Sequence, residues 1–202
     1  MDRFDLEAAS ENKVCMPDRE AAKEAERYLE QMLEEQDSVG GVVECVITGL
    51  PAGVGETVFE KLDARLAHAE MSIGAVKGVE IGDGFEAAKA VGSVNNDDFC
   101  RNADGTIGKR TNHSGGVLGG MSDGSPLILR AAFKPTPSIS RPQQTMNRAG
   151  EEVETVIKGR HDPIIVPRAV VVVETMAAFT AADLLLQNAV AKLDNVRKVY
   201  GR

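Results

Sequence analysis

Three ionisable residues stand side by side in the segment GRHDPIIVPRAVVVVE, residues 159–174, directly before a long apolar run. A charge taken out of water must be paired, or it costs several kcal/mol. Arg160, His161 and Asp162 therefore favour either a solvated strand end or a site that holds a charged ligand. In an extended backbone Arg160 and Asp162 point to one side and His161 to the other, and the following proline favours that geometry.

Asp162 is the residue in this segment that best suits proton transfer. A guanidinium beside a carboxylate favours the charged form, so a neighbouring Arg160 keeps Asp162 usable as a base or as an acceptor. A lone salt bridge that caps a strand explains the same pair without a ligand. The apolar run after the proline is predicted to be a buried strand.

A second segment, GGVLGGMSDG, holds five glycines at positions 115, 116, 119, 120 and 124. Glycine lets the backbone approach a ligand closely and direct N–H groups at an anion. The spacing fits neither GxGxxG nor GxxxxGK[ST], so it does not support a dinucleotide fold or a Walker loop. A tight turn packed against a neighbouring strand is the structural alternative.

The segment KPTPS runs from Lys134 to Ser138. Lys134 offers a cation, Thr136 and Ser138 offer hydroxyls, and Pro135 and Pro137 stiffen the segment by fixing φ. This set suits a phosphate or a polar ring edge. An ordinary proline-rich turn is the alternative.

Metal chemistry finds little support in the sequence. The three histidines have no metal-ligand spacing, which argues against zinc. The three cysteines lie far apart with no CxxC pair, which is typical of free thiols in a reducing cytosol: Cys15, Cys45 and Cys100.

The bulk composition indicates a soluble, cytoplasmic, globular protein. The 202 residues include 23 basic and 31 acidic side chains, a net charge of −8, which disfavours nonspecific nucleic-acid binding. Hydrophobic residues make up 43% of the chain, enough for a core. The polar start MDRFDLEAAS resembles no signal peptide, and no uninterrupted apolar run approaches the roughly 20 residues of a membrane span.

Helices and strands are predicted to alternate irregularly, which favours an α+β fold in a single domain over residues 1–202. The expected elements are an arm or edge strand over 1–16, a helix from Asp18 to about Leu33, a strand at 41–49, a helix from Val58 to Ala69, a long exposed loop at 94–112, a strand at 126–133, and a closing helix at 176–198. Residues 143–156 are ambiguous but could pair as a strand.

Taken in order, five stretches resemble the chorismate synthase family. They are DSVGGVVECVITGLPAGVGE, KLDARLAHAEMSIGAVKGVEIGDGF, TNHSGGVLGGMSDG, KPTPSI and GRHDPIIVPRAV, and the likeness extends from about residue 14 to 185. The resemblance implies a cytoplasmic lyase of aromatic amino acid biosynthesis, in the shikimate pathway. It implies a β-α-β sandwich, assembled as a homotetramer.

The implied reaction is a 1,4 anti elimination of phosphate and a proton from 5-enolpyruvylshikimate 3-phosphate, giving chorismate. It requires reduced FMN although there is no net redox change, and the family is also associated with NADP. By resemblance, Asp162 is the base near the flavin and Arg160 contacts both flavin and substrate. The implied FMN contacts are Gly74, Ala75, Gly119, Lys134, Pro135, Thr136, Pro137 and Ser138.

The chain departs from the family in length. It corresponds to roughly the C-terminal half, and the N-terminal half of the family carries a Gly-Glu-Ser-His-Gly motif, a second histidine and substrate arginines. Ile164 and Val171 also replace residues, Cys and Pro, that are common in the family. We therefore expect the isolated chain to be inactive or to need a complementary N-terminal polypeptide. The alternative is a non-catalytic flavin-binding or structural fragment.

Overall fold

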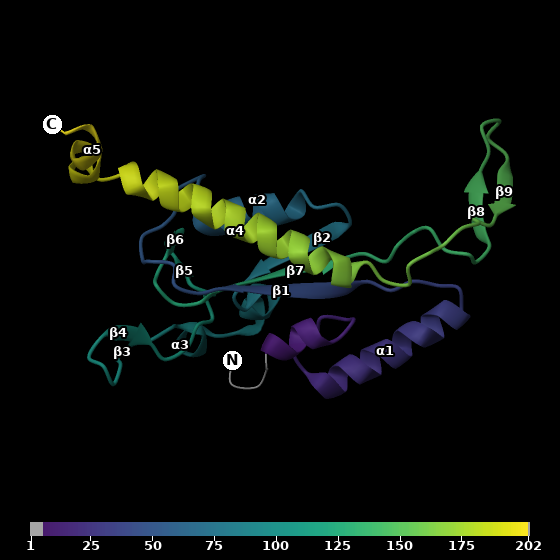
Figure 1. Ribbon diagram of the computed structural model, residues 1–202, viewed down its shortest axis with the longest axis horizontal. Helices are drawn as coiled ribbons and strands as arrows, with labels where there is room; N and C mark the ends of the chain where they lie inside the picture. The colour runs from purple at the N-terminus through teal and green to yellow at the C-terminus, as the bar shows by residue number, and fades with distance from the viewer. Residues whose placement is uncertain (1–5, 202) are drawn as a thin grey trace. The chain divides into compact units, whose positions relative to one another are not determined.

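The computed structural model describes residues 6–201 (Figure 1). Helices and strands are mixed, which confirms the predicted α+β class. The chain forms two compact units. The first contains the chain up to Val42 together with Ala132–Val170, and the second contains Val43–Ala131 together with Val171 onward.

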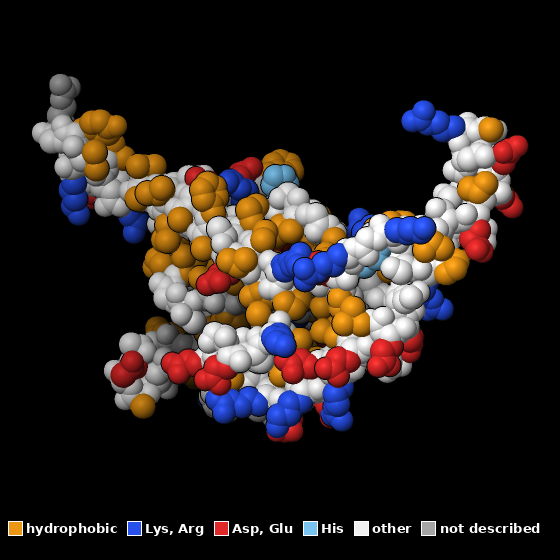
Figure 2. All heavy atoms as spheres, turned by 45° about the vertical axis from the view of Figure 1, so that its right-hand side comes forward, with side chains coloured by type: hydrophobic (Ala, Val, Ile, Leu, Met, Phe, Trp, Pro, Cys, Tyr) orange, Lys and Arg blue, Asp and Glu red, His pale blue; other side chains and the backbone are white. Residues whose placement is uncertain are grey.

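The first unit contains α1, Arg19–Glu34, which starts where the sequence predicts. The Asp18 carboxylate accepts hydrogen bonds from the amides of Glu20, at 2.9 Å, and Ala21, at 3.1 Å, as a helix N-cap does. Met32 is buried on the predicted apolar face, whereas acidic and basic side chains follow one another along the outer face (Figure 2). A 3-10 helix, η1 (Leu6–Glu11), precedes α1.

The ambiguous segment 143–156 forms a two-stranded antiparallel hairpin in the first unit. Strand β8 is Gln143–Met146, and strand β9 is Glu152–Thr155. Asn147 closes the turn, because its Oδ1 accepts from the amides of Ala149, at 2.9 Å, and Glu151, at 3.0 Å. An Asx side chain that bonds to the backbone ahead of it is a common turn device.

A three-stranded sheet has the order β1-β7-β2. Its strands are β1 (Gly41–Ile47), β7 (Leu127–Phe133) and β2 (Val76–Ile81). This confirms the strands predicted at 41–49 and 126–133. In β7 every second residue is buried, from Leu127 through Leu129 and Ala131 to Phe133, because successive side chains of a strand point to opposite faces.

The second unit carries several short elements. They are α2 (Leu62–Met71), η2 (Gly84–Lys89), α3 (Gly92–Asn95), β3 (Phe99–Arg101), β4 (Ile107–Lys109), β5 (Val117–Leu118), β6 (Met121–Ser122) and α5 (Leu193–Tyr200). Within the expected loop at 94–112, β3 and β4 pair antiparallel, with Cys100 opposite Gly108. The hairpin gives this polar stretch a defined backbone.

The predicted start of the second helix is wrong by four residues. Helix α2 begins at Leu62, whereas Val58 and Phe59 precede it and are exposed. Val58 has φ +65°, a left-handed backbone that a β-branched residue rarely adopts and that a helix cannot contain. Leu62 and Leu66 are buried on the predicted face.

The apolar run at residues 166–174 is helical, so the predicted buried strand is wrong. It forms the first turns of α4, Val166–Val190, which begins ten residues before the predicted closing helix. A short apolar run rich in β-branched residues does not distinguish a buried strand from a buried helix. Burial of Val173, Ala177 and Leu184 at helical spacing decides the matter.

Helix α4 is also apolar on its outer side, where Val171, Phe179 and Leu186 are exposed (Figure 2). By length and composition it could cross a membrane, although the core helix of a soluble protein can pass the same test. Polar contacts fix it in the second unit. Arg65 Nη2 bonds to Asp183 Oδ2 at 2.8 Å, and Asn188 Nδ2 donates to the Gly53 carbonyl at 2.7 Å.

The acidic side chain of Glu70 lies inside the second unit. Glu70 is fully buried, and neither of its carboxylate oxygens has a hydrogen-bond partner within residues 6–201. Burial raises the pKa of Glu70 to about 7. Burial, together with the negative charges of Glu70 and Glu174, raises the pKa of Cys45 to about 11. Glu70 is therefore a protonated acid in the folded chain at mildly acidic pH.

We predict that Glu70 makes the chain less stable as the pH rises from about 4.5 to about 7. In that window the unfolded chain releases the proton and the folded chain retains it, so the free energy of unfolding falls by up to roughly 3 kcal/mol. Glu70→Gln should remove this loss, while Glu174→Gln, at an exposed position, should keep it. Thermal unfolding from pH 4 to 8 measures both, and parallel profiles for Glu70→Gln and the unsubstituted chain would contradict the prediction.

Candidate functional site

Within the first unit, residues 38–40 hold the KPTPS and GRHDP segments together. The Ser38 hydroxyl donates to the Thr136 carbonyl at 2.7 Å. The amide of Val39 donates to the Pro163 carbonyl at 2.8 Å. Two neighbouring residues just before β1 therefore bind both segments that the sequence singles out. Local sequence gives no signal for Ser38 or Val39, because their partners lie about a hundred residues away in the chain.

Gly40 follows these two residues and makes the close approach possible. A side chain there would clash with the Phe133 carbonyl oxygen, and it would lie 3.2 Å from the ring of Pro135. Only glycine allows the two backbones to lie so close. Gly40 of DSVGG thus serves this close approach, whereas α1 already ends at Glu34 and the left-handed residue after it is Gln36.

A direct contact also joins the two segments. Ser138 Oγ lies 2.8 Å from His161 Nδ1, and His161 Nε2 lies 2.9 Å from the carbonyl oxygen of Ile157. His161 is thus turned toward the KPTPS segment. The alternation of an extended backbone predicts only that it faces away from Arg160 and Asp162.

The KPTPS segment offers unused hydrogen-bonding capacity. The Thr136 hydroxyl is buried and has no partner among the described residues, and Lys134 is exposed. An unpaired buried hydroxyl is unfavourable unless a ligand or water completes it. The segment therefore fits a ligand with polar edges, such as a flavin, better than it fits a purely structural turn.

Asp162 has a cationic partner other than the expected one. Arg168 Nη1, in the first turn of α4, lies 2.9 Å from Asp162 Oδ2, whereas Arg160 is exposed. Residues 159–165 form no strand, so the alternation that would place Arg160 beside Asp162 does not apply. The expected Arg160–Asp162 pair is therefore replaced by Asp162–Arg168.

The second unit holds the other predicted residues, Gly74, Ala75 and Gly119. Gly119 and Gly120 form the turn of the β5–β6 hairpin with φ of +63° and +89°, the left-handed pair that a type I′ turn requires. No described residue lies within 4 Å of the position where a Gly119 side chain would be, and the same holds for Gly74. Ala75, between α2 and β2, has φ +73°. Both glycines thus leave space above the backbone.

Gly115 is used differently from Gly119. A side chain there would overlap the backbone of Gly82, and one at Gly82 would overlap His113 and Gly115 in turn. The amide of Asp83 donates to the His113 carbonyl at 2.8 Å across the same contact. At Gly115 the glycine therefore serves packing rather than a ligand, because it lets one turn lie closely against the backbone of Gly82.

A buried ionic cluster, which the sequence analysis missed, anchors the glycine-rich loop. Lys109 forms an ion pair with Asp123, and Asp97 accepts hydrogen bonds from Ser114, His113 and Thr111; the Ser114 hydroxyl bond measures 2.6 Å. Burial would raise the pKa of Asp97, but these hydrogen bonds outweigh it and hold the pKa well below its usual range. Asp97 therefore acts as a fixed acceptor rather than as a base.

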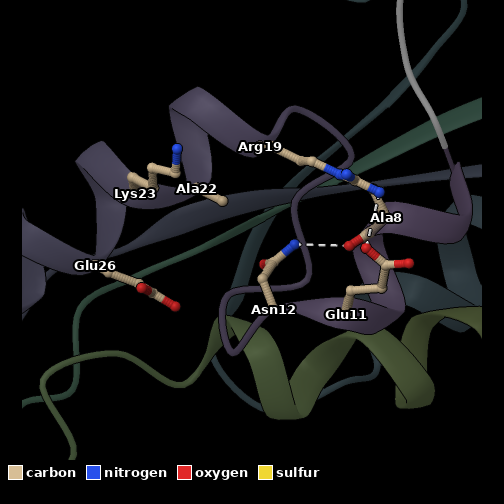
Figure 3. Close-up of a pocket in the computed structure, with 7 residues that line it drawn as sticks. All are labelled: Ala8, Glu11, Asn12, Arg19, Ala22, Lys23 and Glu26. Atoms are coloured by element: carbon tan, nitrogen blue, oxygen red, sulfur yellow. Dashed lines mark hydrogen bonds and ion pairs between the residues drawn. The ribbon is translucent and has the colours of Figure 1, made fainter.

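A separate cavity of about 220 Å³ lies in the first unit, between η1 and α1 (Figure 3). The Arg19–Glu11 ion pair, at 2.9 Å, and the hydrogen bond from Asn12 to the Ala8 carbonyl, at 2.8 Å, belong to its wall. None of the residues predicted from the sequence lines it. Nor do the described residues contain a cluster of three or more metal-binding side chains.

Comparison with known proteins places this fold. A solved structure titled "Crystal Structure of Chorismate Synthase" superimposes with a TM-score of 0.75 and 32% identity, over 96% of this chain and 52% of that one. The α+β fold is thus that of a class of lyases. The sequence pattern of chorismate synthase matches residues 3–186, and the chain belongs to the chorismate synthase family.

Curated relatives of high sequence identity support the same family membership. Chorismate synthase of Lachnoclostridium phytofermentans is 64% identical over 187 residues, which are 93% of this chain and 51% of the relative. That of Archaeoglobus fulgidus is 56% identical over 182 residues, or 90% and 50% respectively. The chain therefore spans about half the length of the curated relatives it matches.

We predict that alanine at Gly115 destabilises the chain far more than alanine at Gly119. Both glycines have φ +63°, so the strain of a left-handed alanine, roughly 1–2 kcal/mol, is common to both. Of the two, only at Gly115 does the new methyl group overlap backbone, which adds about 1–3 kcal/mol. Denaturant unfolding of the two variants measures the difference, and equal losses would contradict the assigned close contact.

Proposed function

We propose that this chain carries the flavin-binding and proton-accepting part of a chorismate synthase. The full reaction eliminates phosphate and a proton, 1,4 and anti, from 5-enolpyruvylshikimate 3-phosphate to give chorismate. Family membership supports the reaction. The observation that carries the proposal is the joining of the KPTPS and GRHDP segments through Ser38, Val39 and His161.

The residues of the first unit have distinct roles in this proposal. Lys134 and the hydroxyls of Thr136 and Ser138 bind FMN, and the two prolines between them keep those groups in place. When bound, reduced FMN supplies electron density to the substrate as the phosphate leaves, and recovers it afterwards. Arg160, exposed and outside the Asp162 ion pair, is available to the anionic substrate and the flavin.

Asp162 is the proposed base. Its ion pair with Arg168 fixes the direction of the carboxylate, and about a third of the Asp162 side chain is exposed, which leaves it within reach of a ligand. Gly119, Gly74 and Ala75 contribute backbone contacts to FMN, which the open space above the two glycines supports.

The remaining half of the family's length is the proposed partner for turnover. It supplies the histidines that act as general acids and the arginines that bind the substrate, either on the same polypeptide or on a complementary one. The apolar outer side of α4 suits such an association, since Val171, Phe179 and Leu186 are exposed there. We place the protein in the cytoplasm, assembled as a homotetramer as in the family.

We predict that the 202-residue chain quenches FMN fluorescence on titration and that Thr136→Val weakens this binding about fivefold to tenfold. The substitution keeps the shape and removes a hydroxyl that has no partner among the described residues, so it should not lower the unfolding temperature. Thr57→Val, at an exposed position in the other unit, serves as the control. A flat titration would exclude flavin binding by this chain.

We predict that adding the N-terminal half of a family member allows phosphate release from the substrate, and that Asp162→Asn lowers the rate by about 10²- to 10⁴-fold. Asp104→Asn, in the β3–β4 turn, should leave the rate unchanged. Flavin binding without phosphate release in the reconstituted mixture would favour the non-catalytic fragment, and full activity of Asp162→Asn would exclude Asp162 as the base.

A further inference from the structure

The two hydrogen bonds of His161 determine which tautomer its neutral ring adopts. The carbonyl oxygen of Ile157, 2.9 Å from Nε2, can only accept, so Nε2 carries the hydrogen. In the neutral ring Nδ1 is then an acceptor, and the Ser138 hydroxyl, 2.8 Å away, must donate to it. The direction of the Ser138 hydroxyl thus follows from a backbone carbonyl on the far side of the imidazole.

We propose that His161 is a positioning residue for the KPTPS segment, acting as a neutral Nε2–H imidazole between Ile157 and Ser138. The consequence of this contact is that the segment is preorganised to bind FMN. That consequence rests on the proposed function. The Ser138 hydrogen is committed to His161, so Ser138 presents lone pairs, and the ligand group that it contacts is a hydrogen-bond donor such as a flavin N–H or a ribityl hydroxyl.

The other contacts of the KPTPS segment do not fix the Ser138 hydroxyl, so this role belongs to His161. Ser38 holds the KPTPS segment at the Thr136 carbonyl, and Gln143 Nε2 donates to the Pro137 carbonyl at 3.1 Å. Both contacts act on the backbone, so neither fixes the Ser138 hydroxyl. Of the charged groups in the GRHDP segment, Asp162 is paired with Arg168 and Arg160 is exposed.

Two amide variants separate the two bonds of the ring. In His161→Asn the side-chain oxygen can take the place of Nδ1 and accept from Ser138. In His161→Gln the side-chain nitrogen can take the place of Nε2 and donate to the Ile157 carbonyl, but it does not reach Ser138. The Asn variant should therefore keep Ser138 in position, whereas the Gln and Ala variants should not. If His161 had a purely structural role, the Asn variant would not be better than the Gln variant.

Nitrogen NMR of the ligand-free chain tests the tautomer. A protonated Nε2 and an unprotonated Nδ1 are expected for His161, and Ser138→Ala should shift the Nδ1 resonance. Backbone order parameters of Thr136 and Ser138 should fall from the rigid range, about 0.85, toward the flexible range below about 0.6 in His161→Gln, but not in His161→Asn. His68→Ala, on the outer face of α2, is the control.

FMN titration then links the contact to the ligand. His161→Gln and His161→Ala should raise the dissociation constant about fivefold to tenfold, and adding Ser138→Ala to either should raise it no further. A hydrogen on Nδ1, or equal loss of order in the Asn and Gln variants, would overturn the positioning role. Absence of FMN binding by the unsubstituted chain would instead overturn the proposed function, because the NMR measurements need no ligand.

Discussion

Two hydrogen bonds from consecutive residues hold together the KPTPS and GRHDP segments, on which the proposed flavin site depends. Ser38 binds the backbone of Thr136, and Val39 binds that of Pro163. Gly40, without a side chain, lets this connection lie against Phe133 and Pro135. Because the anchors are backbone atoms, the arrangement tolerates changes in most side chains of the two segments. It does not tolerate a side chain at Gly40.

In the second unit, buried hydrogen bonds and an ion pair hold a polar, glycine-rich loop in place. Asp97 gathers the hydrogen bonds of Thr111, His113 and Ser114, and the Lys109–Asp123 pair lies beside them. Every polar group in this cluster has a partner, so burial of the charges is compensated. Glu70 shows the opposite case, since it is a buried acid whose two oxygens have no hydrogen-bond partner in the described part of the chain.

The glycines of GGVLGGMSDG divide into two kinds, and the division bears on function. Gly115 is needed because another backbone lies against it, so it explains packing. Gly119 lies at a hairpin turn with no described atom within 4 Å of where its side chain would be, so it leaves space for the proposed ligand. The motif that suggested an anion site from its composition thus contains both a structural contact and an open surface.

The sequence by itself determined the family, the α+β class, the start of α1 at Asp18 and the strands at β1 and β7, because these follow from capping, alternation and residue order. It also identified Asp162 and the KPTPS segment as the residues to examine. The tertiary structure decided that residues 166–174 are helical, that Arg168 rather than Arg160 pairs with Asp162, and that His161 meets Ser138. Those outcomes depend on long-range burial and on partners distant in the chain, which local propensity and spacing do not contain.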